Sequence, residues 1–250
     1  EIDAETRSWL YPIYPFKTQE DQQQFIDHFH PANLLSRHPK ARSLITATEL
    51  ASLQSMVQRY IQAMKLSPDI IVQEGVMCAW MKQNADDTKS EDPKGVEMVP
   101  AIAYCNYLDG KIINVKFRSV QQHPITGEWS KLFCQVSPTK PCAPYGIDSI
   151  NLLRPDAQPI RQLIITEGEK DRLTLMTCGF PYVLSIANGA STNIEESHEA
   201  FDDWIQQAGE IIICGDTDRP GRRLVKLLIE QYQTRAKVTT LPQGKKDISE

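Results

Sequence analysis

Two short acidic segments contain the residues best suited to chemistry in this chain. Glu167 lies in the first segment, and Asp216 and Asp218 lie in the second. Each segment follows a short apolar run, at residues 163–165 and 211–213, of the kind that forms a buried strand. Carboxylates gathered at strand ends offer hard oxygen ligands, which suit Mg²⁺ or Mn²⁺, and such ions are used to handle phosphates. The pattern therefore predicts a metal-dependent enzyme that acts on nucleic acid.

The spacing of these acids supports a shared cation. Asp216 and Asp218 are two residues apart, so in extended backbone both side chains project to the same side. Glu167 comes from a different strand end, and the glycine after it permits a tight turn. Clustered carboxylates repel one another, and a divalent cation removes that repulsion. We predict all three as metal ligands; the alternative is that the segments are only a surface turn and a helix start.

Four nearby charged residues are weaker candidates. Asp247 follows the last predicted strand and can reach the same edge of the sheet. Asp171 lies one turn into a predicted helix, where it either binds metal through water or acts as a favourable charge at the helix N-terminus. Lys170 and Arg219 either contact phosphate or are solvated side chains.

The elements from residue 163 onward place these acids at one edge of a sheet. Strand-like apolar runs alternate with helical patterns, which implies a mostly parallel sheet with helices on its faces. Ligands bind such sheets outside the carboxyl ends of the strands. Gly179 and Gly209 fall where C-terminal helix caps belong. The predicted strands are 163–166, 182–187, 210–214 and 237–241, and the predicted helices are 170–178, 194–208 and 220–234.

A different pattern fills the first part of the chain. A helical stripe of apolar residues begins at Thr48, and the period changes to two from Val99. Asp109-Gly110 is a strong turn signal for an antiparallel hairpin. Residues 9–16 are aromatic and broken by proline, so regular structure is not expected there. The predicted helices are about 19–28, 48–64 and 68–74, the predicted strands are 101–104, 111–118 and 129–136, and the predicted loops are 84–97 and 137–160.

The second strand of this hairpin has an apolar and a basic face. Ile113, Val115 and Phe117 point one way, while Asn114, Lys116 and Arg118 point the other. A row of basic side chains is suited to phosphate contacts, and Lys131 on the next predicted strand can join it. The alternative is a basic face that is merely solvated.

Composition sets wider limits. The chain has 250 residues and a net charge of −5, but its basic residues concentrate between positions 219 and 246, so the total does not exclude nucleic acid as a partner. No apolar run approaches membrane-spanning length. The six cysteines form no CxxC pair, which favours free thiols in a reducing cytosol over disulfides or a zinc ribbon. Without an initial Met, the chain looks like a piece of a longer protein.

The two acidic segments resemble the two signatures of the Toprim domain, which occurs in primases, topoisomerases and some nucleases. The first is EGEKD at residues 167–171, and the second is DTDRPGR at residues 216–222. The form is most similar to primase-helicases of the phage and mitochondrial type, with support from the segment 241–247 and the basic strand 115–118. The clear match covers about 163–247, and a weaker one covers about 49–150.

Pattern and resemblance together predict the fold class and the parts of the chain. We expect an α+β N-terminal subdomain, with helices and an antiparallel sheet, followed by an α/β Toprim domain with a mostly parallel sheet. The expected parts are an N-terminal extension at 1–45, a basic primase subdomain at 46–160 and a Toprim catalytic domain at 161–250.

The resemblance also implies roles for single residues. Glu167, Asp216 and Asp218 match the family's catalytic acids; the aspartate pair binds Mg²⁺ there, and a later aspartate, matching Asp247, assists. The implied reaction joins ribonucleoside triphosphates on a single-stranded DNA template to make RNA primers. The residues implied to hold nucleotide or template phosphates are Lys116, Arg118 and Lys131.

Two features of such primases have no counterpart in this sequence. It has no cysteine pattern for a zinc-binding template reader and no phosphate-binding loop of a helicase motor. We expect a helicase domain or protein as a partner, in a cytoplasmic setting of bacterial or phage type, with an organellar one as the alternative. Two other functions remain open: a Toprim nuclease or strand-cleaving enzyme, and a non-catalytic module that binds DNA or a helicase.

Overall fold

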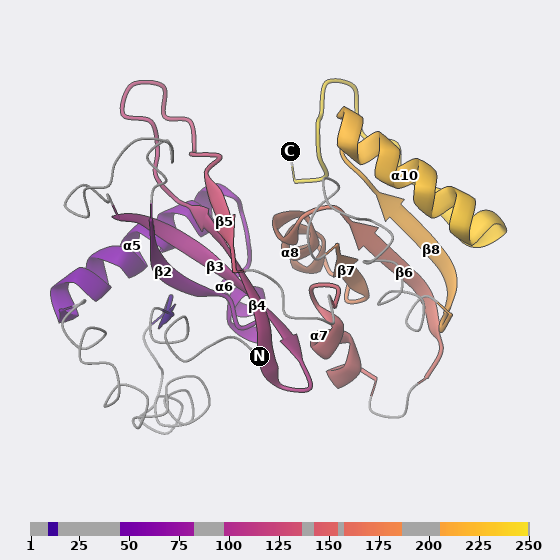
Figure 1. The fold of residues 1–250 in the computed structure, drawn as a ribbon, viewed down its shortest axis with the longest axis horizontal. Coiled ribbons are helices and arrows are strands. Elements are labelled where there is room, and N and C mark those ends of the chain that lie inside the picture. The colour runs from indigo at the N-terminus through magenta and orange to yellow at the C-terminus, as the bar shows by residue number, and fades with distance from the viewer. Residues whose placement is uncertain are drawn as a thin grey trace. The chain divides into compact units, whose positions relative to one another are not determined.

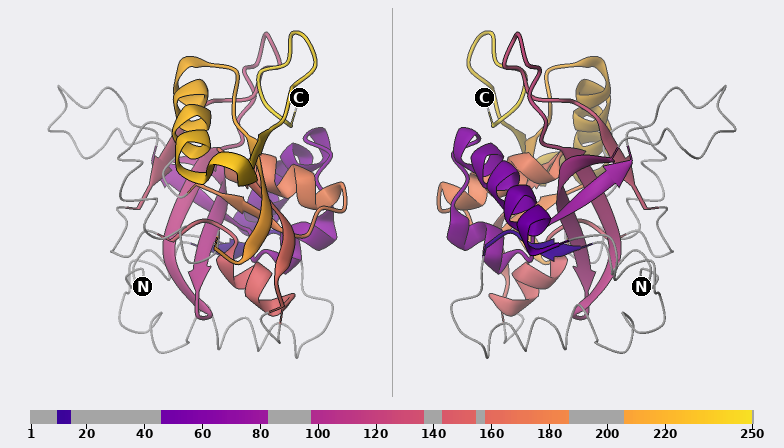
Figure 2. Two further views of the ribbon diagram at one scale, coloured as in Figure 1. Left: turned by 90° about the vertical axis from the view of Figure 1, so that its right-hand side faces the viewer. Right: turned by 90° about the vertical axis from the view of Figure 1, so that its left-hand side faces the viewer.

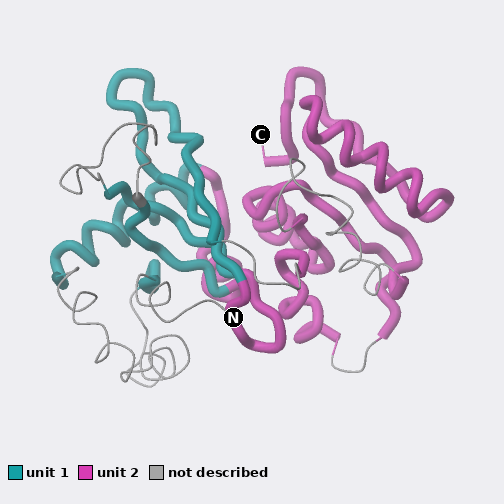
Figure 3. Tube along the Cα trace, viewed as in Figure 1, with its two compact units in different colours: residues 1–63, 75–105, 114–137 teal, residues 64–74, 106–113, 138–250 magenta. Residues whose placement is uncertain are grey.

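A computed structural model describes residues 10–14, 46–82, 98–136, 143–154, 158–186 and 206–249 (Figure 1). The predicted helix at 19–28 and the predicted loop at 84–97 lie outside these residues, and so do residues 194–205 of the predicted helix 194–208. The end of that helix is wrong, because Gln206 and Gln207 form a turn and Ala208 begins a strand. The chain divides into two compact units whose segments alternate along the sequence (Figure 3). Unit 1 comprises residues 1–63, 75–105 and 114–137, and unit 2 comprises residues 64–74, 106–113 and 138–250.

An antiparallel sheet forms the centre of unit 1, and its middle hairpin extends into unit 2. Five strands pair in the order β1-β2-β3-β4-β5. Helix α5 (Ala47–Ala63) packs against β2 on one face of this sheet, with its apolar stripe buried (Figure 2). The strands are β1 (Tyr11–Pro12), β2 (Met77–Lys82), β3 (Met98–Leu108), β4 (Lys111–Ser119) and β5 (Phe133–Gln135).

Helix α5 begins one residue earlier than the sequence predicts. The backbone N–H of Thr46 donates to Glu49 Oε2 at 2.6 Å, and the N–H of Glu49 donates to Thr46 Oγ1 at 3.2 Å. This reciprocal capping box satisfies two backbone donors that the first helical turn leaves unpaired. Thr46 is therefore the cap, and Thr48 lies inside the helix.

The hairpin turn at Asp109-Gly110 is confirmed. The φ angles of Asp109 and Gly110 are 52° and 72°, as a two-residue hairpin turn of type I′ requires. Both backbone N–H groups donate to the carboxylate of Asp148, at 3.0 and 2.7 Å. The turn is thus tied to a helix that lies far along the chain.

Three expectations for unit 1 need correction. Tyr11–Pro12 forms the short strand β1, and β2 pairs with both β1 and β3, although no strand is predicted at either position. A proline is tolerated there because β1 lies at the sheet edge. The strand expected over 129–136 is limited to β5, and Trp129 forms only an isolated bridge with Gln122.

Unit 2 contains a parallel sheet with helices on both faces, and the predicted fold class is confirmed. The strands pair in the order β7-β6-β8-β9, all parallel. They are β6 (Ile160–Thr166), β7 (Val183–Ser185), β8 (Ala208–Cys214) and β9 (Ala236–Val238). The helices are α6 (Pro68–Gln73), α7 (Ile147–Leu152), α8 (Glu169–Thr177) and α10 (Arg219–Tyr232), the last followed by the 3-10 turn Gln233–Arg235.

Alternate residues of the central strands bury against different helices. On β6, Leu163 and Ile165 pack into the core that α7 and α10 cover, whereas Ile164 packs with Leu175 and Met176 of α8. Because both faces are covered, the central parts of these strands are continuous apolar runs rather than alternating. This explains why the runs at 163–165 and 211–213 are recognisable in the sequence.

Two expectations for unit 2 are wrong. The loop predicted over 137–160 contains helix α7, which is held by burial of Ile147 and Ile150 and not by a long helical pattern. Gly209 lies inside β8 rather than at a helix cap. The cap at Gly179 is confirmed, with φ at 92° and its N–H donating to the carbonyl of Met176 at 3.0 Å.

Two wider expectations can be compared with the described residues. The five cysteines among them, Cys78, Cys105, Cys134, Cys178 and Cys214, are all free. No helix in the part of the chain that the structure describes has the length and apolar character needed to cross a membrane.

A buried ion pair joins the helices of unit 2. The Arg172 side chain of α8 is fully buried, and its Nη1 lies 2.5 Å from Oε2 of Glu74, which follows α6. Arg172 Nε also donates to the carbonyl of Val183 at 2.8 Å, and its guanidinium lies over the ring of Tyr145. Ser149 of α7 donates to the same Glu74 oxygen at 2.6 Å. One buried charge therefore connects α6, α7, α8 and β7.

Breaking this pair should destabilise the fold strongly. Glu74→Gln leaves a buried guanidinium without its counter-charge, so we expect a loss of about 3–5 kcal/mol in the free energy of unfolding. Arg172→Met should cost a similar amount, and the double variant less than the sum, in urea denaturation. The exposed pair Lys226–Glu230 on α10 is the control, and Lys226→Met should cost less than about 1 kcal/mol. Equal losses at the buried and the exposed pair would contradict this account.

Candidate metal site

The ends of two neighbouring strands bring the three predicted acids together. Strands β6 and β8 pair in register, with Thr166 opposite Cys214, so both end at the same level. Glu167 directly follows β6, and Asp216 and Asp218 follow β8 after one glycine. One carboxylate oxygen from each acid lies within 4.8 Å of the other two. Strand register thus produces the cluster from segments about 50 residues apart.

Asp218 has a second, structural role that fixes its position. Its Oδ1 accepts a hydrogen bond from the backbone N–H of Gly221 at 3.0 Å, so it is the N-cap of α10. Gly221 must be a glycine, because a Cβ there would lie 2.4 Å from the carbonyl oxygen of Asp216. The close approach of these two residues bends the backbone between the aspartates. The cap leaves Asp218 Oδ2 to contact Lys246 Nζ, at 3.1 Å.

The electrostatics of the triad suit a cation. Burial raises the pKa of Glu167, and the Asp216 carboxylate raises it further. Burial also raises the pKa of Asp216, whereas the hydrogen bond from Gly221 lowers that of Asp218. Glu167 Oε2 is buried and has no hydrogen-bond partner. Hard oxygen ligands and an unsatisfied buried carboxylate oxygen both fit a divalent ion.

Lys246 contacts this site, and the sequence patterns do not single it out. Its Nζ lies 3.1 Å from Asp218 Oδ2 and 3.5 Å from Asp216 Oδ2, and these carboxylates raise the pKa of Lys246. The backbone N–H of Thr217 donates to the Lys246 carbonyl at 2.9 Å, which holds the segment against the site. The signal that could have found it is its position directly before Asp247, itself a candidate acid.

The weaker acidic candidates lie beside the triad rather than in it. Asp171 is buried at the start of α8, and its pKa is raised to about 7, first by burial and then by the Asp247 carboxylate. Asp247 forms an ion pair with Lys170, with 3.7 Å between Asp247 Oδ2 and Lys170 Nζ. Lys170 therefore contacts an acid of this cluster. Arg219 is exposed at the start of α10.

The basic candidates belong to unit 1. Lys116 and Arg118 are half-buried on β4, and Lys131 is exposed before β5. The Arg118 guanidinium lies over the Tyr60 ring, 5.9 Å from its centroid. Asn114 is buried, so the solvent-facing row expected on β4 is limited to Lys116 and Arg118. Their contact with phosphate stays a prediction.

Comparison with known proteins finds similarity to one family model and to two curated relatives. Residues 164–250 match the family model described as Toprim-like, so the resemblance read from the two acidic segments is confirmed. Over 140 residues the chain is 28% identical to the primase homolog protein of Arabidopsis thaliana, covering 51% of this chain and 36% of the relative. Over 195 residues it is 24% identical to the chloroplastic/mitochondrial Twinkle homolog protein of that plant, covering 73% of this chain and 23% of the relative.

A solved structure shares the fold. The primase fragment of the bacteriophage T7 primase-helicase protein superposes with a TM-score of 0.54 at 23% identity, covering 75% of this chain and 66% of the fragment. The likeness extends beyond the Toprim-like part, since that part is only residues 164–250. The chain spans well under half the length of either curated relative.

Removing the Lys246 ammonium should make the triad a better cation site. An ammonium at Asp216 and Asp218 competes with a divalent ion, and an exposed pair of this kind is worth up to about 1 kcal/mol. We expect Lys246→Met to tighten Mn²⁺ binding by up to about fivefold in isothermal titration calorimetry. Lys245→Met is the matched control and should leave the affinity unchanged. Weaker Mn²⁺ binding by Lys246→Met would contradict competition.

Replacing Asp171 should change stability in a pH-dependent way. Its raised pKa means that its contribution to stability is fully present below the unfolded-state pKa, near 4, and is lost as pH rises through about 7. The Asp171→Asn side chain does not ionise, so the variant should avoid the loss of unfolding free energy that Asp171 causes at about pH 8. Each kcal/mol of unfolding free energy recovered should raise Tm by about 2–4 °C, and the rise should be smaller at about pH 5. Calorimetry in EDTA measures both values. Equal shifts would indicate a packing effect and contradict this account.

Proposed function

We propose that this chain, whose residues 164–250 are a Toprim-like domain, is the catalytic core of a DNA primase. It would join ribonucleoside triphosphates into short RNA primers on a single-stranded DNA template. The observation that carries the proposal is the acidic triad at the carboxyl edge of the Toprim-like sheet. The shared fold with the T7 primase fragment, which extends beyond the Toprim-like part, favours a primase over other Toprim proteins. We propose a primase subdomain at 46–160 and a Toprim domain at 161–250, preceded by an N-terminal extension at 1–45.

Mg²⁺ or Mn²⁺ is the proposed cofactor. Glu167, Asp216 and Asp218 would hold it, and their clustered oxygens fit an ion with hard ligands. When bound, the ion supplies charge stabilisation for phosphates and lowers the pKa of an oxygen nucleophile. Asp171 and Asp247 would lie beside the ion rather than bind it directly. The carboxylates of Asp247 and Asp216 both raise the pKa of Asp171, so the charges of these residues already interact.

The chain's own acids would position and deprotonate the reacting groups. Asp218 is fixed by its hydrogen bond from Gly221, so its carboxylate keeps a constant position. Glu167 has a raised pKa and an unpartnered buried oxygen, Oε2, which makes it the better base. We propose that the Glu167 carboxylate oxygen not bound to the ion accepts the proton of the primer 3′-hydroxyl, while Lys246 moves from the aspartates to phosphate oxygens.

The basic residues would hold nucleic acid, and a helicase would be the protein partner. Lys116, Arg118 and Lys131 are proposed to contact phosphates of the template or of the incoming nucleotide, and Arg219 is a further candidate at the exposed start of α10. Lys170 would act chiefly by positioning Asp247. A helicase partner is proposed because the T7 relative is a primase-helicase. The chloroplastic/mitochondrial name of one relative favours an organellar setting beside the cytoplasmic one.

Primer synthesis tests the proposal. Labelled ribonucleotides should be incorporated on single-stranded DNA, both de novo and from an annealed RNA primer, which bypasses template capture. Asp216→Asn should reduce both activities about 100-fold or more, because loss of metal-based charge stabilisation costs several kcal/mol. Lys245→Met is the folded control and should remain active.

Three results would overturn the primase assignment. One is a folded, Mn²⁺-binding protein that extends no annealed primer. A second is metal-dependent nicking of DNA without nucleotide incorporation, which would identify a Toprim nuclease. A third is single-strand binding that neither EDTA nor Asp216→Asn affects, in the absence of incorporation, which would identify a non-catalytic module.

A further inference from the structure

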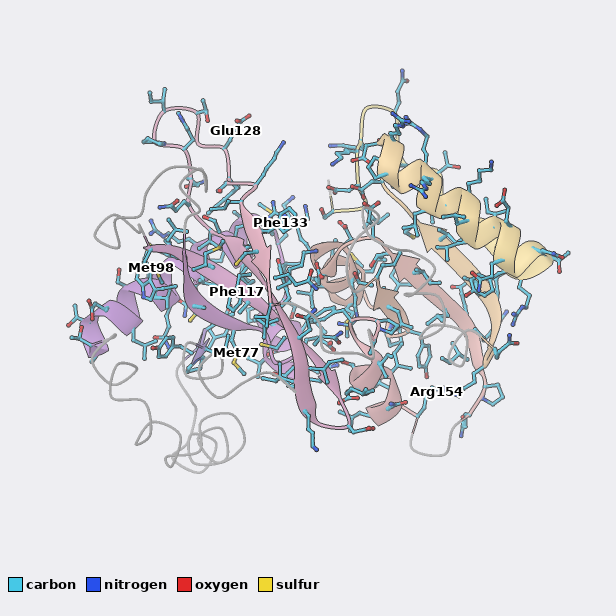
Figure 4. The ribbon with its side chains drawn as sticks, in the orientation of Figure 1. Met77, Met98, Phe117, Glu128, Phe133 and Arg154 are labelled. Atoms are coloured by element: carbon cyan, nitrogen blue, oxygen red, sulfur yellow. The ribbon has the colours of Figure 1, made fainter. Side chains whose placement is uncertain are left out.

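An exposed aromatic ring lies at the edge of the antiparallel sheet in unit 1. β5 is the last strand in the order β1-β2-β3-β4-β5, and Phe133 on it is 63% exposed. Phe117, on the neighbouring β4, is only 8% exposed, because it faces the core (Figure 4). A single exposed apolar side chain is ordinary in a protein surface. What distinguishes Phe133 is the set of side chains around it.

Cationic side chains share its face of the sheet. Arg118 is the cross-strand partner of Phe133, and Lys116 is the partner of Gln135, so all four side chains project to one side. Lys116 Nζ lies over the Phe133 ring, 5.7 Å from its centroid. Lys131, two residues before Phe133, is exposed as well. An open ring is thus flanked by positive charges on its own strand and on its neighbour.

Aromatic contacts hold Arg118 in place. It lies over the Tyr60 ring, and Tyr60 is braced by an edge-on contact with Trp129, with 5.0 Å between the ring centroids. Arg118 Nε is buried and has no hydrogen-bond partner, and among the described residues no carboxylate pairs with it. A fixed, partly desolvated cation of this kind favours an anionic ligand.

We propose that Phe133 is a stacking platform for an unpaired base of single-stranded DNA, with Lys116 and Arg118 on the adjacent phosphates. An exposed ring can stack only on a base whose face is free, which excludes the interior of a duplex. Flanking cations match a phosphate backbone better than an apolar protein surface. The proposal deepens the proposed function, because it identifies residues that would bind the template strand. Its test requires only that the protein binds single-stranded DNA.

Strand binding without catalysis tests it. Anisotropy of a dye-labelled oligothymidylate is measured in EDTA without nucleotides. Phe133→Leu should weaken binding about 5- to 100-fold, the range that alanine substitution of stacking residues gives, and should leave the salt dependence unchanged. Lys116→Gln should instead reduce the slope of log affinity against log salt by about 0.7. Ile125→Ala, at an 89% exposed apolar residue in the same unit, is the matched control and should change nothing.

A tryptophan variant separates the possible ligands. Phe133→Trp should keep the affinity, and its fluorescence should be quenched by the oligonucleotide and not by a duplex. An oligonucleotide of abasic sites should bind wild type and Phe133→Leu equally. Unchanged affinity of folded Phe133→Leu would overturn the proposal, and so would quenching by free nucleotides alone. Because no primer synthesis is measured, strand binding through Phe133 stands or falls separately from the primase assignment.

Discussion

The buried charge of Arg172 is the constraint on which the architecture of unit 2 depends. A guanidinium removed from water is tolerated only where partners compensate its charge. Here they are Glu74 after α6, the Val183 carbonyl of β7 and the Tyr145 ring before α7, although Nη2 is buried without a hydrogen-bond partner. Gly146 is part of the same constraint, because a Cβ there would lie 2.1 Å from Arg172 Nε. Since Arg172 is on α8, the turn that carries Glu167 enters a helix whose position is already fixed.

The metal site adds only local requirements to this frame. The register between β6 and β8 brings two acidic turns to one level, and the cap of α10 sets one carboxylate. Lys246 balances part of the negative charge before any ion arrives. The site is therefore assembled by backbone geometry, with few side-chain contacts of its own. The two short acidic segments are recognisable in the sequence because each contains the residues that this backbone geometry requires.

The sequence predicts best what local patterns determine. Continuous apolar runs mark β6 and β8 because both faces of a parallel sheet are covered, and Asp109-Gly110 marks the hairpin because its backbone needs positive φ. From those elements the positions of Glu167, Asp216 and Asp218 follow.

What the sequence does not reveal depends on distant partners. α7 is short and has no helical pattern of its own, and β1 exists only by pairing with β2. The contact of Lys246 with the aspartates and the pair between Arg172 and Glu74 join positions separated by about 30 and 98 residues. No local propensity encodes such contacts, because each requires the folded chain.

The cap of α10 has a consequence for how a metal would be coordinated. One oxygen of Asp218 is already engaged by a backbone N–H, so an ion would compete with Lys246 for the other oxygen. If each acid of the triad gave a single oxygen, the protein would supply three ligands to an ion, and water or phosphate oxygens would supply the others. An ion with such exchangeable ligands would be shared readily with a ligand that brings its own oxygens.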